Sequence, residues 1–102
     1  MKNKICLVTG GTDGIGKATA RGLAKLGATV VIVGRNTGKA SHVVDEIRCA
    51  TQNPHIEAIS ADLSSLKQVR NLAENFKAHY KRLDVLVNNA GLVTHERRTY
   101  HP

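Results

Sequence analysis

The chain has 102 residues, of which 41% are hydrophobic, and it carries 15 Lys and Arg against 8 Asp and Glu. This length suits one domain or part of a larger one and excludes two full domains, while the apolar content is too high for a disordered segment. The net charge of +7 favours acidic ligands such as phosphates. Because the basic residues are scattered and only 3% of the chain is aromatic, they are read as solvated surface, and no nucleic-acid site is expected.

The two cysteines, Cys6 and Cys49, have neither metal-site spacing nor the density of a disulfide framework, so both are expected to be buried thiols. The five histidines show no ligand spacing, and no metal site is expected. No apolar stretch approaches the roughly 20 residues that cross a bilayer, and the amino terminus lacks the apolar segment of a secretory signal. These features predict no membrane span and a cytoplasmic location.

Short apolar runs alternate with amphipathic segments along the chain. The runs that predict strands are residues 5–8, 29–33, 56–61 and 83–87. The segments that predict helices are residues 14–26, residues 37–49 and a third segment that begins at Ser65. With right-handed crossovers, this alternation gives a parallel sheet in the order 3-2-1-4 with three helices. The expected fold class is therefore α/β, a partial Rossmann-type doubly wound sheet.

Particular residues indicate how these elements begin, end and pack. In the first helix, four residues are expected to be available for packing on the sheet, namely Ile15, Ala18, Leu23 and Leu26. Gly27 is placed to end the helix. Ser65 and Gln68 have the spacing of a capping box at the start of the third helix. The last apolar run would be an exposed edge unless a further strand pairs with it, so a missing neighbour is expected.

A glycine-rich segment, residues 9–16, follows the first apolar run and opens the first helical segment. Glycine lets the backbone approach a charged ligand, and a helix N-terminus presents free N–H groups to an anion. An ordinary turn is the alternative, but the position between strand and helix favours a dinucleotide pyrophosphate. The residues expected at this site are Gly10, Thr12, Asp13, Gly14, Ile15 and Gly16.

Residues 9–16 read Thr-Gly-x-x-x-Gly-x-Gly, and residues 88–91 read Asn-Asn-Ala-Gly. In both motifs, and in their separation, the chain resembles the short-chain dehydrogenase/reductase family, from Ile5 through Gly91. The resemblance corresponds to the amino-terminal portion of a family member. It implies an NAD(P)-binding half-domain at residues 1–92 and a loop at residues 93–102 that leads to a missing catalytic portion.

The end of the second apolar run bears on the choice of cofactor. Folds that bind NAD usually place an acidic residue about 20 positions beyond the glycine loop, where it holds the ribose hydroxyls. This chain has Gly34-Arg35-Asn36 there, and a guanidinium can pair with a 2′-phosphate. NADP is therefore favoured over NAD, and the alternative is a solvated Arg35 at a helix start. Many NADP-preferring family members carry a basic residue where this chain has Asp13, which weakens the assignment.

The resemblance also implies roles for residues after the third and fourth apolar runs. Asp62 corresponds to a family residue that accepts a hydrogen bond from the adenine amino group, and Leu63 would line the ring pocket. The alternative for Asp62 is a simple turn or helix cap. Near the adenosine ribose the resemblance places Asn89, Ala90 and Gly91.

Family members transfer hydride between the nicotinamide and an alcohol or carbonyl, using a Tyr, a Lys four residues later, a Ser and an Asn. No catalytic residue can be placed here, because Tyr80 is followed by Asp84 at the Lys position and Tyr100 lies two residues from the end. The resemblance implies a full-length NADP-dependent oxidoreductase with a small-molecule substrate, most like the retinol or steroid dehydrogenase branch, and an oligomer formed through the missing portion. The alternative is a dinucleotide-binding regulatory or interaction module without catalysis.

Overall fold

A computed structural model describes residues 2–10, 12 and 14–88 of the chain. Within that part, four parallel strands form one sheet in the order β3-β2-β1-β4. The strands are β1 (Ile5–Thr9), β2 (Thr29–Gly34), β3 (Ile56–Ser60) and β4 (Val85–Asn88). The helices are α1 (Gly14–Lys25), α2 (Thr37–Thr51) and α3 (Leu66–His79). The predicted partial Rossmann fold and its strand order are confirmed.

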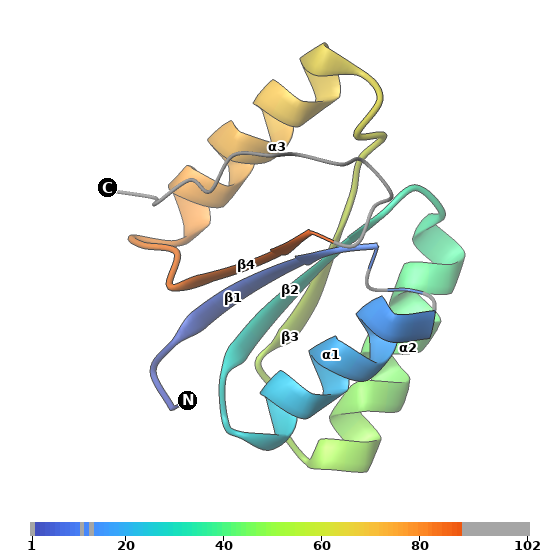
Figure 1. Ribbon diagram of the computed structural model, residues 1–102, viewed down its shortest axis with the longest axis vertical. Coiled ribbons are helices and arrows are strands. Elements are labelled where there is room, and N and C mark those ends of the chain that lie inside the picture. Colours follow the sequence, from blue (N-terminus) through green and yellow to red (C-terminus); the bar gives the residue numbers. More distant parts are fainter. Residues whose placement is uncertain (1, 11, 13, 89–102) are drawn as a thin grey trace.

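The sheet is the middle of three layers. Helices α1 and α2 lie side by side on one face, and α3 lies on the other (Figure 1). The central strands β1 and β2 are therefore covered on both sides, which explains why they lack polar alternation. Under α1 and α2 the core includes Ala20, Ala24, Val43, Val44 and Ile47, packed on alternate strand residues. Under α3 it includes Leu72 and Phe76, packed on Leu7, Val31 and Val33.

Helix α1 faces the sheet mainly with small side chains, and the sequence-based expectation was right only for Leu23. Of the residues expected to pack on the sheet, Ile15 and Leu26 are 78% and 61% exposed, and Ala18 is exposed as well. Leu23 is half-buried and packs against the core as expected. The buried positions of the helix are instead Gly16, Ala20 and Ala24, spaced four residues apart on one face. Small residues at this spacing let the helix lie close to the strands, so this face of the helix is buried without large apolar side chains.

The observed bounds differ from the expected ones by one or two residues at several ends. α1 ends one residue early, at Lys25, and α2 extends two residues further, to Thr51. Ser65 is the N-cap of α3, and its side chain accepts a hydrogen bond from the backbone N–H of Gln68. Cys6 is fully buried as expected, but Cys49 is exposed on α2, contrary to the expectation of a buried thiol.

Strand β4 is the last strand on one side of the described sheet, next to β1. Its side chains at Val85 and Val87 pack against the core under α1 and α2, whereas Leu86 is 53% exposed on the opposite side. A further strand beside β4 stays a prediction. No helix in the part of the chain described by the structure is long and apolar enough to cross a membrane.

The amino-terminal ends of the strands form the amino edge of the sheet, and hydrogen bonds close it. The Asp84 Oδ2 atom accepts a bond from the Ile5 backbone N–H at 2.8 Å, and the Asp84 N–H donates to the Ile5 carbonyl at 2.9 Å. Arg82 donates to the same carboxylate at 3.0 Å and also to the Asn3 carbonyl. The bonds that the carboxylate accepts from Ile5 and Arg82 lower the pKa of Asp84 below its usual value, with the Ile5 bond as the largest cause.

Asn53 makes the second set of contacts at the amino edge. Its side-chain amide is buried and donates to the carbonyls of Ala24 at 3.0 Å and Ala28 at 2.7 Å. Its side-chain oxygen accepts from the backbone N–H of His55 at 2.9 Å. One side chain thereby joins the end of α1, the start of β2 and the start of β3.

Candidate functional site

The carboxyl-terminal ends of the strands form the opposite, carboxyl edge of the sheet, and a cleft of about 800 Å³ opens there. Its walls come from the glycine loop after β1, the end of β2, the start of α2 and the segment after β3. Small-molecule sites typically measure about 300–1,000 Å³. Of the predicted site residues, the cleft brings together Gly10, Thr12, Ile15, Gly16, Arg35, Asp62 and Leu63.

The glycine loop starts in a conformation that favours glycine. Gly10 has a φ of 64° and Gly14 a φ of 50°, both in the left-handed region. The Gly10 N–H donates to the Val33 carbonyl at 3.0 Å, which fixes the start of the loop to β2. Helix α1 begins at Gly14, which is not itself among the residues that line the cleft. The first N–H groups of α1 have no partner within the helix and are available to an anion.

Ile15 contributes to the cleft rather than to the core. Its side chain is 78% exposed at the first turn of α1 and lines the cleft, whereas the neighbouring Gly16 is buried. The exposure that contradicts the packing expectation therefore agrees with the position expected for Ile15 at the ligand site.

The loop passes very close to the end of β2. A Cβ atom at Gly34 would lie 2.9 Å from the Cγ2 atom of Thr12, closer than carbon atoms pack without a shift. The absence of a side chain at Gly34 therefore sets how near the loop lies to the second strand. This requirement was missed in the sequence, where Gly34 was noted only because it is not an acidic residue.

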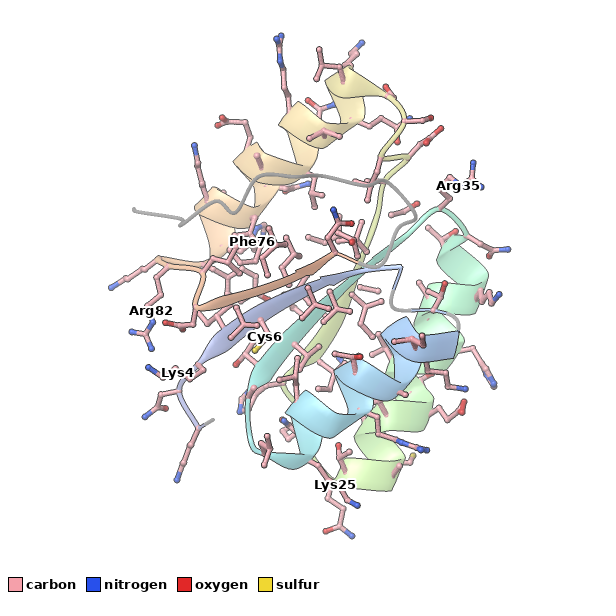
Figure 2. The ribbon with its side chains drawn as sticks, viewed as in Figure 1. Lys4, Cys6, Lys25, Arg35, Phe76 and Arg82 are labelled. Carbon is pink, nitrogen blue, oxygen red and sulfur yellow. The ribbon has the colours of Figure 1, made fainter. Side chains whose placement is uncertain are left out.

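Two positively charged residues, Arg35 and Lys39, lie where β2 leads into α2. Figure 2 shows Arg35 projecting at the carboxyl edge, beyond the end of β2. Asn36 caps α2, with its side-chain oxygen accepting from the backbone N–H of Lys39 at 2.9 Å. Both Asn36 and Lys39 line the cleft together with Arg35. Lys39 was also missed, although its position one helical turn after Arg35 was a usable signal.

Asp62 supplies the carboxylate that lines the cleft. Its Oδ1 atom accepts hydrogen bonds from the Ser64 hydroxyl at 2.7 Å and the Ser64 backbone N–H at 3.0 Å. The Ser64 hydroxyl, then the Ser64 N–H and the nearby Arg35 charge lower the pKa of Asp62 below its usual value. The carboxylate is therefore ionised at neutral pH. Asp62 forms a turn and is not the helix cap, since Ser65 caps α3.

Other predicted site residues lie outside the described part of the chain. These are Asp13, Asn89, Ala90 and Gly91. Just before the last three, Asn88 ends β4, and its side-chain oxygen accepts from the Thr9 hydroxyl at 3.0 Å. This bond ties the carboxyl ends of β1 and β4 together.

Tyr80 lies away from the cleft. Its hydroxyl donates to the Glu57 carboxylate on the outer strand, and its ring stacks on Phe76 at a centroid distance of 4.8 Å. A second hollow, of about 470 Å³, runs along β3 and is lined by residues of α2, β3 and α3, including Tyr80. None of the predicted site residues that the structure describes lines that hollow. Within residues 2–10, 12 and 14–88, no group of three His, Cys, Asp or Glu side chains could hold a metal ion.

Known proteins are similar to this chain in sequence and in fold. Human polyprenol dehydrogenase is 44% identical over 91 residues, which cover 89% of this chain and 28% of that protein. Human retinol dehydrogenase 12 is 42% identical over 93 residues, covering 91% of this chain and 29% of that protein. The chain thus spans under a third of the length of these curated relatives and matches their amino-terminal portion.

A solved structure, the Pseudomonas aeruginosa RhlG/NADP active-site complex, superposes with a TM-score of 0.82 at 40% sequence identity. The match covers 90% of this chain and 36% of that one. The model of the short chain dehydrogenase family matches residues 4–101, nearly the whole chain. The chain therefore belongs to the short chain dehydrogenase family.

Proposed function

We propose that the chain is the NADP-binding part of an oxidoreductase that transfers hydride between the nicotinamide and an alcohol or carbonyl substrate. The observation that carries this proposal is the cleft at the carboxyl edge, where the glycine loop, Arg35 and Asp62 lie together. In open α/β sheets, ligands bind at this edge where the strand order reverses, which here is between β1 and β4.

The pyrophosphate is proposed to lie against the start of α1. Free N–H groups around Thr12, Ile15 and Gly16 would donate to its oxygens, and the partial positive charge of the helix N-terminus would favour the anion. The buried Gly16 supports this placement, because a residue without a side chain lets the start of the helix lie close to the strands. Asp13 would repel a phosphate there unless its carboxylate turns outward or is paired.

The 2′-phosphate of NADP is proposed to bind beside Arg35. A guanidinium pairs with phosphate through two parallel hydrogen bonds, and Lys39 adds a second cation to the same wall. Asp62 is the only carboxylate among the residues that line the cleft in the described part of the chain. Residues 34–36 at the end of β2 include no acidic side chain, so none of these three would repel the additional phosphate or bind both ribose hydroxyls in its place.

The adenine ring is proposed to lie against Asp62 and Leu63, with residues 89–91 near the adenosine ribose. Residues 1–92 then form the cofactor-binding unit, and residues 93–102 lead towards the part that supplies the catalytic groups. The names of the polyprenol and retinol dehydrogenases support a lipophilic alcohol or its carbonyl as the substrate class of the whole protein.

The test measures dissociation constants for NADPH and NADH in the chain and in Arg35→Asp. Loss of the cation and gain of a repelling charge should weaken NADPH by at least about tenfold and NADH much less. Arg70→Asp, which makes the same charge change at an exposed position of α3, is the matched control and should alter neither constant. Equal weakening of both cofactors by Arg35→Asp would defeat the NADP assignment.

A second measurement separates binding from catalysis. NADPH mixed with the chain and a simple carbonyl compound should bind without being oxidised, because none of the family's catalytic residues can be placed in residues 1–102. Steady loss of NADPH absorbance catalysed by the purified chain would contradict this expectation.

A further inference from the structure

Both the main chain and the side chain of the turn at residues 62–64 are fixed by hydrogen bonds. The backbone N–H of Asp62 donates to the Gln68 side-chain oxygen at 2.6 Å, and the Asp62 carbonyl accepts from the Ser65 N–H at 3.0 Å. The spacing of Ser65 and Gln68 had predicted a reciprocal capping box, but the Gln68 side chain does not complete it. Its side chain instead fixes the main chain of Asp62.

The carboxylate of Asp62 is fixed as well, and its two oxygens are used unequally. Both hydrogen bonds that it accepts from described residues come from Ser64, and both reach Oδ1. Oδ2 accepts none from the described residues and belongs to a side chain that lines the cleft. An ionised oxygen without its own donor is an acceptor ready for an N–H group of a ligand.

We propose that Ser64 is a positioning residue that holds Asp62 with Oδ1 occupied and Oδ2 presented to the exocyclic amino group of the cofactor base. This inference rests on the proposed function, which places adenine beside Asp62. Ser64 would thereby control which purine the cleft selects, although the hydrogen bond to the base is made by Asp62.

The chemical reason is that the carboxylate can only accept hydrogen bonds. Adenine presents an amino donor at the six position, whereas hypoxanthine presents a carbonyl oxygen there, which would face the carboxylate as a second acceptor. Discrimination between the two bases depends on the carboxylate keeping one orientation. A freely rotating side chain would make the contact less often and would lose more conformational entropy on binding. The Ser64 hydroxyl and N–H supply that restraint.

The experiment compares NADPH with its hypoxanthine analogue, nicotinamide hypoxanthine dinucleotide phosphate in reduced form. The two ligands share every phosphate, so contributions from Arg35 and the glycine loop cancel in the ratio of their dissociation constants. Dissociation constants are measured for the unmodified chain, Ser64→Ala, Ser64→Thr and the control Ser41→Ala on the exposed face of α2.

The unmodified chain should prefer NADPH, and Ser64→Ala should reduce that preference at least about threefold, mainly by weakening NADPH. Ser64→Thr keeps the hydroxyl and should retain the preference, as should Ser41→Ala. If Ser64→Ala weakens both ligands equally, or weakens neither, the positioning role is wrong while the NADP site stands. If the unmodified chain binds the two ligands equally, base selection by this turn is wrong. If it binds neither, the proposed function fails and this inference fails with it.

Discussion

The two edges of the sheet carry similar polar groups and use them differently. At the amino edge, the side chains of Asp84, Arg82 and Asn53 bind backbone groups, and Arg82 also binds Asp84. At the carboxyl edge, Arg35 and Asp62 line a cleft. Figure 2 shows Lys4 and Arg82 at one end of the sheet and Arg35 at the other. The difference separates groups that hold the fold together from groups left available for a ligand.

Two aspartates make the contrast clear, because the pKa of each is lowered by hydrogen bonds. Asp84 accepts from the backbone of β1 and from Arg82, so its bonds join segments far apart in the sequence. Among the residues that the structure describes, the Asp62 carboxylate accepts hydrogen bonds only from Ser64, two residues away. These local bonds orient the carboxylate without joining distant elements. Substitutions at the amino edge should therefore reduce stability, and substitutions at the carboxyl edge should reduce ligand affinity.

The largest effect is expected from Asn53→Ala. It removes three hydrogen bonds and leaves buried carbonyls of Ala24 and Ala28 without this donor, so the free energy of unfolding should fall by about 2–3 kcal/mol. Urea denaturation measures this change. Asn71→Ala, at an exposed position of α3, is the matched control and should stay within about 0.5 kcal/mol of the unmodified chain. Equal free energies of unfolding of the two variants would contradict the assignment of a stabilising role to the amino edge.

An intermediate effect is expected from Gly34→Ala at the carboxyl edge. The new Cβ would collide with Thr12, and the displaced loop should weaken NADPH binding by about tenfold, because overpacking typically costs about 1–3 kcal/mol. Isothermal titration measures the affinity. Gly22→Ala is the matched control, since a Cβ there meets nothing within 4 Å and alanine favours a helix interior. Unchanged NADPH affinity in Gly34→Ala would show that the position of the glycine loop beside β2 does not affect ligand binding.

The smallest effect is expected in the acid range. The folded-state pKa of Asp84 is depressed, so its contribution to stability is present above the unfolded-state pKa of about 3.9 and is lost as pH falls through the folded value. Asp84→Asn should lower stability at neutral pH and flatten its decline below about pH 4. Urea midpoints measured against pH check this, with Glu74→Gln on α3 as the control. An acid decline as steep in Asp84→Asn as in the unmodified chain would contradict the assignment.

The fold was predictable because its signals are local and strong. Runs such as Val30 to Val33 are apolar on both faces, and a glycine loop between strand and helix leaves few topologies open. The packing of α1 was not predictable in the same way. Its buried positions are Gly16, Ala20 and Ala24. Hydrophobicity alone instead predicts burial of the larger Ile15 and Leu26, which are exposed.

The candidate site was predictable where a motif names its residues, as at Gly10, Arg35 and Asp62. It was not predictable where a tertiary contact gives a residue its role. The approach of Thr12 to Gly34 depends on how the loop crosses β2, and the bond from Asp62 to Gln68 replaces a capping arrangement that the spacing favoured. Local sequence does not encode either distance.

The central claim is that the carboxyl edge, and not the amino edge, binds the cofactor. The most direct measurement is a titration of the isotope-labelled chain with NADPH, followed by backbone amide chemical shifts in NMR spectra. Saturable shifts should centre on Gly10, Thr12, Arg35 and Leu63, and the amides of Asn53 and Asp84 should not move. Shifts centred on the amino edge or on the hollow along β3, or no saturable shift at all, would contradict the claim.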